Sequence, residues 1–338
     1  MKTKAAVLIQ TREPLAVVDL GIPPLKEGQV LVEVAYSGVC HTQLLECRGY
    51  RGEDKFLPHC LGHEASGVVR EIGPGVTKVR PEQKVILSWM KGSGKNVPGT
   101  TYDWNGTAVN AGAVTTFSRS TVVSENRLTP VADDFDLKSA ALLGCAAATG
   151  LGSVLNVAQP KAGQSLAVFG AGGIGLCAVA GARIAGCRPV IAIDLLEERL
   201  ALAKAMGATE CRLAGKEGAK LEGLDFAVEA TGVPEVMLQA VECVRPQGGT
   251  IVIVGNARHG QRLQLDPFHF NLGKRLLGTW GGDNDPDRDF PKYAGWVSSG
   301  ALNLRPLISK CYPLAEINRA LDDLETGRAA RPLIDMSL

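Results

Sequence analysis

Residues 166–175 read Leu-Ala-Val-Phe-Gly-Ala-Gly-Gly-Ile-Gly, an apolar strand that runs straight into the pattern G-x-G-x-x-G. Such glycines permit a tight turn between strand and helix, and they let backbone N–H groups approach a pyrophosphate at the positive end of that helix. The pattern by itself is weak, since a bare packing turn would be about as likely. Gly170, Gly172, Gly173 and Gly175 are candidate contacts to a dinucleotide, and this assignment needs support from the flanking sequence.

The next apolar strand, VIAID, supplies that support because it ends at Asp194, about 20 residues past the glycines. A carboxylate at that offset accepts hydrogen bonds from both ribose hydroxyls and repels a 2′-phosphate, so NAD is favoured over NADP. Asp194 could instead cap the helix that follows, but the combined context favours contact with the cofactor. Arg199, one turn further, could flank the ribose or be a solvated helix charge.

Alternating strands and helices continue from residue 166 onwards. Apolar strands recur at LDFAVEA and TIVIVG with a helical stretch between them, a pattern typical of a doubly wound parallel sheet. Up to about residue 124 the chain reads instead as short β segments with glycine turns, such as QVLVEVAYSG and QKVILSW. The sequence therefore predicts an α/β protein in which a β-rich region of barrel character precedes a doubly wound domain.

Length and charge exclude several classes of function. The 338 residues are too many for one ordinary domain and suggest two. Lys and Arg number 36 against 35 Asp and Glu, a net charge of +1, which gives no electrostatic case for nucleic acid or an anionic membrane as partner. No stretch reads as a signal peptide or membrane span, and the nine scattered cysteines indicate reduced thiols or metal ligands. We expect a cytoplasmic protein.

Three residues of the β-rich part stand out as metal-ligand types. Cys40 lies in Gly-Val-Cys-His-Thr, His63 in Gly-His-Glu and Cys145 in Leu-Leu-Gly-Cys. Taken separately each is ambiguous, because free cysteines are often small buried hydrophobes and a lone histidine is often structural. No C-x-x-C occurs, which excludes the usual knuckle-type zinc sites.

Taken together, these segments resemble a known family. Gly62-His63-Glu64-Ala65-Ser66-Gly67, followed by Gly73 and Val76, matches the signature of zinc-containing alcohol dehydrogenases in the medium-chain dehydrogenase/reductase superfamily. Cys40-His41-Thr42 and Leu142-Leu143-Gly144-Cys145, followed by Thr149-Gly150, resemble the family's two other ligand segments. The order Cys, His, Cys and then G-x-G-x-x-G is also the family's, and the similarity covers essentially the whole chain.

The resemblance implies a catalytic zinc held by Cys40, His63 and Cys145, with a fourth position open to water or substrate, and this ligand set suits the metal. It implies that the Thr42 hydroxyl takes the alcohol's proton and that Glu64 lies near the metal. Further roles in cofactor binding are implied for five residues: His41 and Arg331 at the pyrophosphate, Thr149 and Ile174 against the nicotinamide, and Val254 near the end of the TIVIVG segment.

The chain departs from the family at several positions. Many relatives carry four closely spaced cysteines for a structural zinc, whereas residues 90–99 contain none, so we expect one zinc per subunit. Gln43 stands where relatives often have an Asp that hydrogen-bonds the ligand histidine, and a neutral amide makes that imidazole less basic. Leu45 stands where several relatives end the proton relay with a histidine, so the proton would leave through the cofactor ribose or by way of His41.

The substrate pocket is poorly specified. Trp89 and Phe117 align with pocket aromatics of the family, although both could simply pack in the core. Arg119 follows Phe117 by two residues and, if the strand alternates, lies on the same face. It could then bind an acidic group of the substrate, with a surface charge as the alternative.

The resemblance implies a GroES-like catalytic domain over residues 1–146 and 283–338, a Rossmann domain over residues 147–282, and an active site in the cleft between them. The expected function is NAD-dependent hydride transfer between an alcohol and an aldehyde or ketone, by a homodimer or homotetramer joined through its Rossmann sheets. A polyol or sugar-alcohol dehydrogenase, a non-zinc quinone or enoyl reductase and a non-catalytic nucleotide-binding protein are the rival interpretations.

Overall fold

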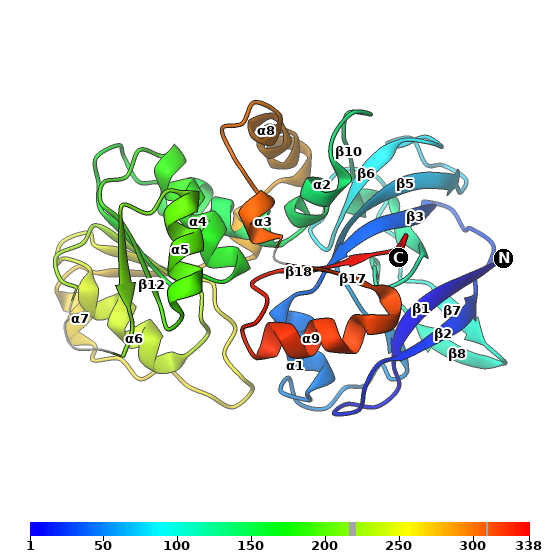
Figure 1. Ribbon diagram of the computed structural model, residues 1–338, viewed down its shortest axis with the longest axis horizontal. Coiled ribbons are helices and arrows are strands. Elements are labelled where there is room, and N and C mark those ends of the chain that lie inside the picture. Colours follow the sequence, from blue (N-terminus) through cyan, green and yellow to red (C-terminus); the bar gives the residue numbers. More distant parts are fainter. Residues whose placement is uncertain (216–220, 309) are drawn as a thin grey trace. The chain divides into compact units, whose positions relative to one another are not determined.

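The computed structural model describes residues 1–215, 221–308 and 310–338, which form two compact units (Figure 1). The β-rich unit consists of Met1–Cys145, Asp285–Gly300 and Ile308–Leu338, and the parallel-sheet unit of Ala146–Asn284 and Ala301–Leu307. The second unit thus takes in a short later segment, residues 301–307, that the sequence had not set apart.

Two β structures make up the β-rich unit. A closed barrel is formed by β1 (Lys2–Leu8), β2 (Ala16–Gly21), β7 (Thr101–Trp104), β8 (Thr107–Asn110) and β4 (His59–Cys60). A larger sheet runs in the order β10 (Leu128–Pro130), β6 (Lys84–Ser88), β5 (Glu64–Ile72), β3 (Gln29–Gly38), β18 (Pro332–Asp335) and β17 (Lys310–Pro313), with β9 (Ser120–Ser124) also pairing with β3. The C-terminal strand β18 lies beside β3, which comes from the N-terminal part of the chain (Figure 1).

The helices of this unit pack on those strands. They are α1 (His41–Cys47), α2 (Leu137–Leu143), α8 (Pro286–Ser298) and α9 (Ile317–Glu325), with 3₁₀ turns η1 (Glu125–Arg127) and η5 (Leu314–Glu316). Val30, Val32 and Val34 of β3 are buried in one apolar cluster with Ile317 and Leu321 of α9. Burial of this kind stabilises a fold by roughly 1.5–3 kcal/mol per large aliphatic side chain, so the C-terminal helix helps to hold the central strand.

The stretch that follows the cysteine-free residues 90–99 forms a β-hairpin. Residues 101–110 form the β7–β8 hairpin, whose two-residue turn has positive φ at both Asn105 (50°) and Gly106 (89°). Asn-Gly is the pair that a type I′ hairpin turn prefers. The hairpin pairs with β2 on one side and β4 on the other, and so closes the barrel.

A buried carboxylate anchors the loop that precedes this hairpin. Glu125 is fully buried and accepts hydrogen bonds from the backbone N–H groups of Thr77 (2.6 Å), Lys78 (2.6 Å) and Lys95 (2.8 Å). Burial alone would raise its pKa, but these N–H donors outweigh burial and hold the pKa below its ordinary value of 4.5. Glu125 therefore joins two loops as an anion.

Replacing Glu125 by Gln is expected to lower the free energy of unfolding by about 1–3 kcal/mol at pH 7, because an amide NH₂ would face a backbone N–H. Since the folded-state pKa is depressed, the carboxylate's contribution is present above pH 4.5 and is lost as the pH falls through the folded value. Urea denaturation should therefore show the gap between the variant and the unaltered protein closing in acid. Glu27→Gln, which removes an exposed partner of Lys95, is the control and should change little. A gap that stayed constant down to pH 3 would contradict this role.

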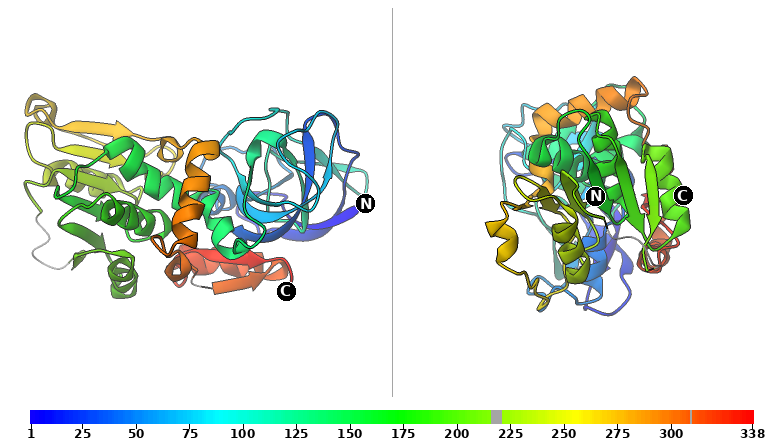
Figure 2. Two further views of the ribbon diagram at one scale, coloured as in Figure 1. Left: turned by 90° about the horizontal axis from the view of Figure 1, so that it is seen from above. Right: turned by 90° about the vertical axis from the view of Figure 1, so that its left-hand side faces the viewer.

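The parallel-sheet unit has six strands in the order β13 (Glu210–Leu213), β12 (Val190–Asp194), β11 (Leu166–Phe169), β14 (Phe226–Glu229), β15 (Thr250–Ile253) and β16 (Arg275–Gly278). Its helices are α3 (Ala146–Gly152), α4 (Gly173–Ile184), α5 (Glu197–Met206), α6 (Pro234–Cys243) and α7 (Phe268–Asn271), with a π-helical segment η2 (Ser153–Ala158) and 3₁₀ turns η3 (Gly281–Asp283) and η4 (Arg305–Leu307). The helices flank the sheet (Figure 2). The strand order is that of a doubly wound nucleotide-binding sheet, with β11 at the point where the order reverses, which confirms the predicted fold class.

Among the described residues, no single helix is long and apolar enough to cross a membrane; the bent pair Leu137–Leu143 and Ala146–Ala158 would pass together by length and composition only.

Candidate metal centre and dinucleotide turn

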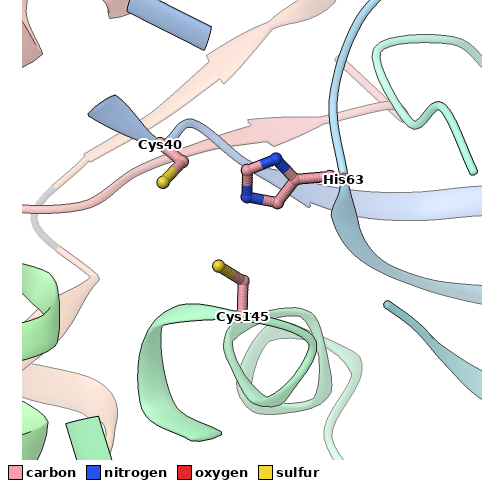
Figure 3. Close-up of side chains that lie close together, drawn as sticks. All are labelled: Cys40, His63 and Cys145. Atoms are coloured by element: carbon pink, nitrogen blue, oxygen red, sulfur yellow. The ribbon is translucent and has the colours of Figure 1, made fainter. Parts of the chain in front are cut away.

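The structure brings Cys40, His63 and Cys145 together although they lie far apart in sequence. One ligand atom from each lies within 4.8 Å of the others. Both sulfur atoms and one ring nitrogen of His63 point toward a shared space (Figure 3). Two sulfurs and one imidazole nitrogen form a set that suits Zn²⁺ and leaves one tetrahedral position for another ligand.

Local structure explains how each side chain is positioned. Cys40 is the N-cap residue of α1, directly after β3. His63 is placed by Gly62, whose φ of +91° is one that side chains rarely adopt, and an added Cβ there would clash with Thr116. Cys145 follows the C-cap of α2, whose carbonyl at Gly144 accepts a 2.6 Å hydrogen bond from the Ser88 hydroxyl.

The buried polar atoms of the site fit a metal ion. His63 Nε2 is buried and makes no hydrogen bond with the described residues. Burying such a polar atom costs free energy unless another group bonds to it. A metal ion bound there would satisfy this atom together with the two cysteine sulfurs. The residues present therefore fit the group that the sequence resemblance implied.

The three side chains also influence one another electrostatically. A hydrogen bond from Cys145 lowers the pKa of Cys40 well below its usual range, against the effect of burial and helped by the charge of Arg331. The same hydrogen bond and burial raise the pKa of Cys145. Burial lowers the pKa of His63, but the sulfur and negative charge of Cys40 outweigh burial and raise it. The two thiols thus favour sharing one proton, which a bound cation would displace.

An ion pair lies buried beside these ligands. Arg331 forms a salt bridge with Glu64, and the two residues are 3% and 0% exposed. Burial lowers the pKa of Arg331, yet the charges of Glu64, Cys40 and Cys145 outweigh it and raise the pKa further. An added Cβ at Gly38 would collide with the Glu64 carboxylate, so this glycine makes room for the pair. Arg331, which was expected at the cofactor's pyrophosphate, thus pairs with Glu64, which was expected near the metal.

The residues expected to relay the proton sit on α1. The Thr42 hydroxyl lies 3.9 Å from the sulfur of Cys40, next to the ligand group. His41, the first residue of the helix, is exposed. Leu45 is half-buried one turn further along, where its side chain offers no proton acceptor. Thr42 is thus the hydroxyl that the structure places at the ligand group.

The three residues predicted to line the substrate pocket differ in their position and exposure. Trp89 is half-buried and donates its backbone N–H to the His63 carbonyl (3.1 Å), so it flanks a ligand residue. Phe117 is 1% exposed within the main apolar cluster, which is the core-packing alternative. Arg119 is exposed whereas Phe117 is buried, so the prediction that they share a face is wrong. The two residues lie at bends on either side of the Ser118 bridge to Ala5 rather than in a regular strand.

Sequence reasoning did not single out a cation that contacts Trp89. Arg127, in the turn η1, hydrogen-bonds through its guanidinium to the carbonyl of Trp89, and its Nε is buried without a hydrogen-bond partner among the described residues. Burial lowers its pKa. No signal in the sequence points to it, because nothing in the local pattern separates Arg127 from an ordinary surface arginine.

In the parallel-sheet unit the glycine pattern forms the turn between β11 and α4. Gly170 has φ of +90°, and an added Cβ at Gly175 would overlap the carbonyl of Gly170. Gly172 is the N-cap of α4, and a Cβ built on it would meet no atom within 4 Å. Open space beside free N–H groups at a helix N-terminus is what a pyrophosphate requires.

Asp194 lies beside this turn, at the end of β12. Its carboxylate accepts hydrogen bonds from the backbone N–H of Ala171 (2.7 Å) and of Leu196 (3.0 Å), and an Arg199 nitrogen lies 3.8 Å away. The N-cap position of α5 is Leu196, so the capping alternative for Asp194 is wrong. Asp194 instead ties the second strand to the glycine turn.

The remaining expected cofactor contacts are also in this unit. Thr149 is buried in α3, and its hydroxyl has no hydrogen-bond partner among the described residues. Ile174 is half-buried in the first turn of α4. Val254 follows β15, held by a 2.8 Å hydrogen bond from its N–H to the carbonyl of Glu229. Thr149 thus offers a free hydroxyl to a ligand.

Comparison with known proteins agrees with this geometry. Residues 26–133 match the model of the alcohol dehydrogenase GroES-like domain, and residues 173–299 that of the zinc-binding dehydrogenase family. The chain is 33% identical to an S-(hydroxymethyl)glutathione dehydrogenase of Synechocystis sp., covering 99% of this chain and 100% of that one. It is 30% identical to a class-P alcohol dehydrogenase of Arabidopsis thaliana, covering 99% and 98%.

Solved structures show the same similarity along the whole chain. The benzyl alcohol dehydrogenase of Acinetobacter calcoaceticus superposes with a TM-score of 0.89 at 29% identity, with 99% of each chain covered. An alcohol dehydrogenase zinc-binding domain protein of Burkholderia ambifaria gives a TM-score of 0.92 at 29% identity and the same coverage. With its Cys-His-Cys group and doubly wound sheet, the chain belongs to the zinc-dependent alcohol dehydrogenases of the medium-chain dehydrogenase/reductase superfamily.

Proposed function

We propose that this protein is an NAD(H)-dependent dehydrogenase that interconverts a neutral alcohol and its aldehyde or ketone, with one catalytic zinc per chain held by Cys40, His63 and Cys145. The observation that carries the proposal is the convergence of three ligand atoms within 4.8 Å. A bound Zn²⁺ supplies a Lewis acid that favours loss of the alcohol's proton near neutral pH.

The chain's own residues supply the other functions. The Thr42 hydroxyl, 3.9 Å from the Cys40 sulfur, is placed to accept the proton from a substrate hydroxyl at the ligand group. Glu64 and Arg331 form a buried pair of opposite charges beside the ligands and keep a fixed electrostatic environment there. Trp89 is bonded through its backbone N–H to the His63 carbonyl and packs against the main apolar cluster, and we assign its ring to one wall of the substrate site, which favours a slender substrate.

The coenzyme preference follows from Asp194. A 2′-phosphate placed at the ribose would meet this buried carboxylate, and the repulsion of like charges costs several kcal/mol. The Arg199 guanidinium lies close enough to Asp194 to offset part of that repulsion. The carboxylate is the nearer group to the glycine turn, with which it shares a hydrogen bond, and we assign NAD on that ground.

The test is reductive turnover of zinc-loaded protein with NADH or NADPH and paired aldehydes, each neutral one matched to an acidic analogue of similar size. We expect kcat/KM to be at least about tenfold higher with NADH and higher for the neutral aldehydes, because the exposed Arg119 no longer supports an anion clamp. Preference for NADPH would overturn the assignment to Asp194. Preference for the acidic aldehydes would mean that a cationic side chain binds the substrate's acidic group, and Arg127 would be the first candidate for that role.

We also infer a homo-oligomer joined through the parallel sheet. Strand β16 is an edge strand of that sheet within the described residues, so its outer N–H and C=O groups are available for pairing. Phe268 (60% exposed) and Phe270 (49% exposed) lie shortly before it. A second copy on this edge would cover both the open strand and these rings.

A further inference from the structure

One buried side chain contacts two of the three ligand residues. Gln43, in the first turn of α1, is only 2% exposed. Its Oε1 accepts a hydrogen bond from the backbone N–H of Cys40 (3.1 Å), and its Nε2 contacts Nδ1 of His63. Gln43 therefore bridges the segments that carry the first two ligands.

The chemistry of these contacts fixes where the proton of His63 sits. A backbone N–H can only donate, so the Gln43 atom that faces Cys40 must be the oxygen. The atom that faces His63 is then the NH₂ group, which also only donates. His63 Nδ1 must accept this hydrogen bond, and a neutral ring carries its single proton on Nε2. That atom faces the two sulfurs (Figure 3).

A metal ion requires the opposite arrangement. It binds a ring nitrogen that carries no proton, so binding at Nε2 moves the ring proton to Nδ1, where it needs an acceptor. The NH₂ group of Gln43 cannot accept it. If the amide turned over, its oxygen would serve His63 but its NH₂ would face the N–H of Cys40. Only one of the two hydrogen bonds can persist once a metal is bound.

From this mismatch, and resting on the proposed zinc site, we propose that Gln43 is a positioning residue that makes the metal site release its ion more readily than a carboxylate in the same place would. A carboxylate of the same length could accept from the Cys40 N–H through one oxygen and from His63 Nδ1–H through the other. Outer partners of metal-bound histidines typically change metal affinity by about 10–100-fold.

The test uses the full-length protein with Gln43→Glu and Gln43→Met, and the readout is metal retention rather than turnover. Transfer of Zn²⁺ to a chromophoric chelator measures the dissociation rate, and the visible absorption of the Co²⁺-loaded protein measures affinity and geometry. We expect Gln43→Glu to hold zinc about 10–100-fold more tightly than the unaltered chain. We expect Gln43→Met, which has a similar shape and no amide, to release zinc less than about tenfold faster than the unaltered chain, because the amide keeps only one of its two hydrogen bonds once a metal is bound.

The outcomes separate this proposal from the zinc site on which it rests. If the unaltered chain takes up no Zn²⁺ or Co²⁺, the proposed site itself fails, and this proposal with it. If the chain binds metal but Gln43→Glu releases zinc as fast or faster, the mismatch is wrong. If Gln43→Met loses zinc tenfold faster, the amide supports the bound metal and the proposal is likewise overturned; this arm remains decisive should the added charge in Gln43→Glu prevent folding.

Discussion

Cys40→Ala and His63→Ala are each expected to abolish zinc retention and to lower turnover by at least about a thousandfold. Two remaining ligands cannot complete the tetrahedral set of a tightly held zinc. The Lewis acid lowers the activation barrier by several kcal/mol, and each 1.4 kcal/mol changes the rate roughly tenfold. Metal analysis of the purified variants and single-substrate kinetics measure the two effects separately.

The matched control for these variants is Cys47→Ala. Cys47 is a buried thiol on the same helix that begins after Cys40, and it packs in the apolar cluster of the β-rich unit. Its loss should leave zinc content near that of the unaltered chain. Turnover that persisted at a normal rate in metal-free Cys40→Ala would end the proposed mechanism, whereas equal loss of zinc in Cys47→Ala would point to general unfolding.

The three candidate ligands could be predicted from the sequence because their segments, in order, resemble those of a known family, and the structure brings their ligand atoms within 4.8 Å of one another. Gly62 before His63 and Gly144 before Cys145 occupy positions where an added Cβ would clash, but the atoms that it would meet belong to Thr116 and Leu87, which are distant in sequence. The doubly wound sheet could be predicted for a different reason, since apolar strands at regular intervals have few other arrangements. The resemblance therefore carried the first conclusion, and the local pattern of strands carried the second.

Contacts between residues distant in sequence could not be predicted in this way. Glu125 was not singled out, since its three N–H partners come from loops 30 to 48 residues away. Arg119 was expected on the face of Phe117 because a regular strand alternates, but the bends at Phe117 and Arg119 break that alternation. The pairing of Glu64 with Arg331 spans 267 residues and depends on β18 lying against β3.

That buried pair gives the second large expected effect. Arg331→Met should lower the free energy of unfolding by about 3–5 kcal/mol, because it leaves the Glu64 carboxylate charged and without its cation in a fully buried position. Removing both charges in Glu64→Gln/Arg331→Met should recover a large part of the loss, since neutral groups of similar size carry no such penalty. Urea denaturation followed by tryptophan fluorescence measures both, with Trp89 and Trp104 reporting from the same unit.

The comparison that isolates burial is Arg328→Met. Arg328 pairs with Asp323 at 2.8 Å in the same C-terminal segment, but its side chain is 63% exposed. Exposed ion pairs contribute about 0–1 kcal/mol, so this variant should lie within that range of the unaltered chain. A loss for Arg331→Met no larger than that for Arg328→Met would mean that Glu64 is neutral or reaches solvent. The Glu64–Arg331 pair would then not provide the fixed charges assigned to it, and the ligand cysteines would face a different electrostatic environment.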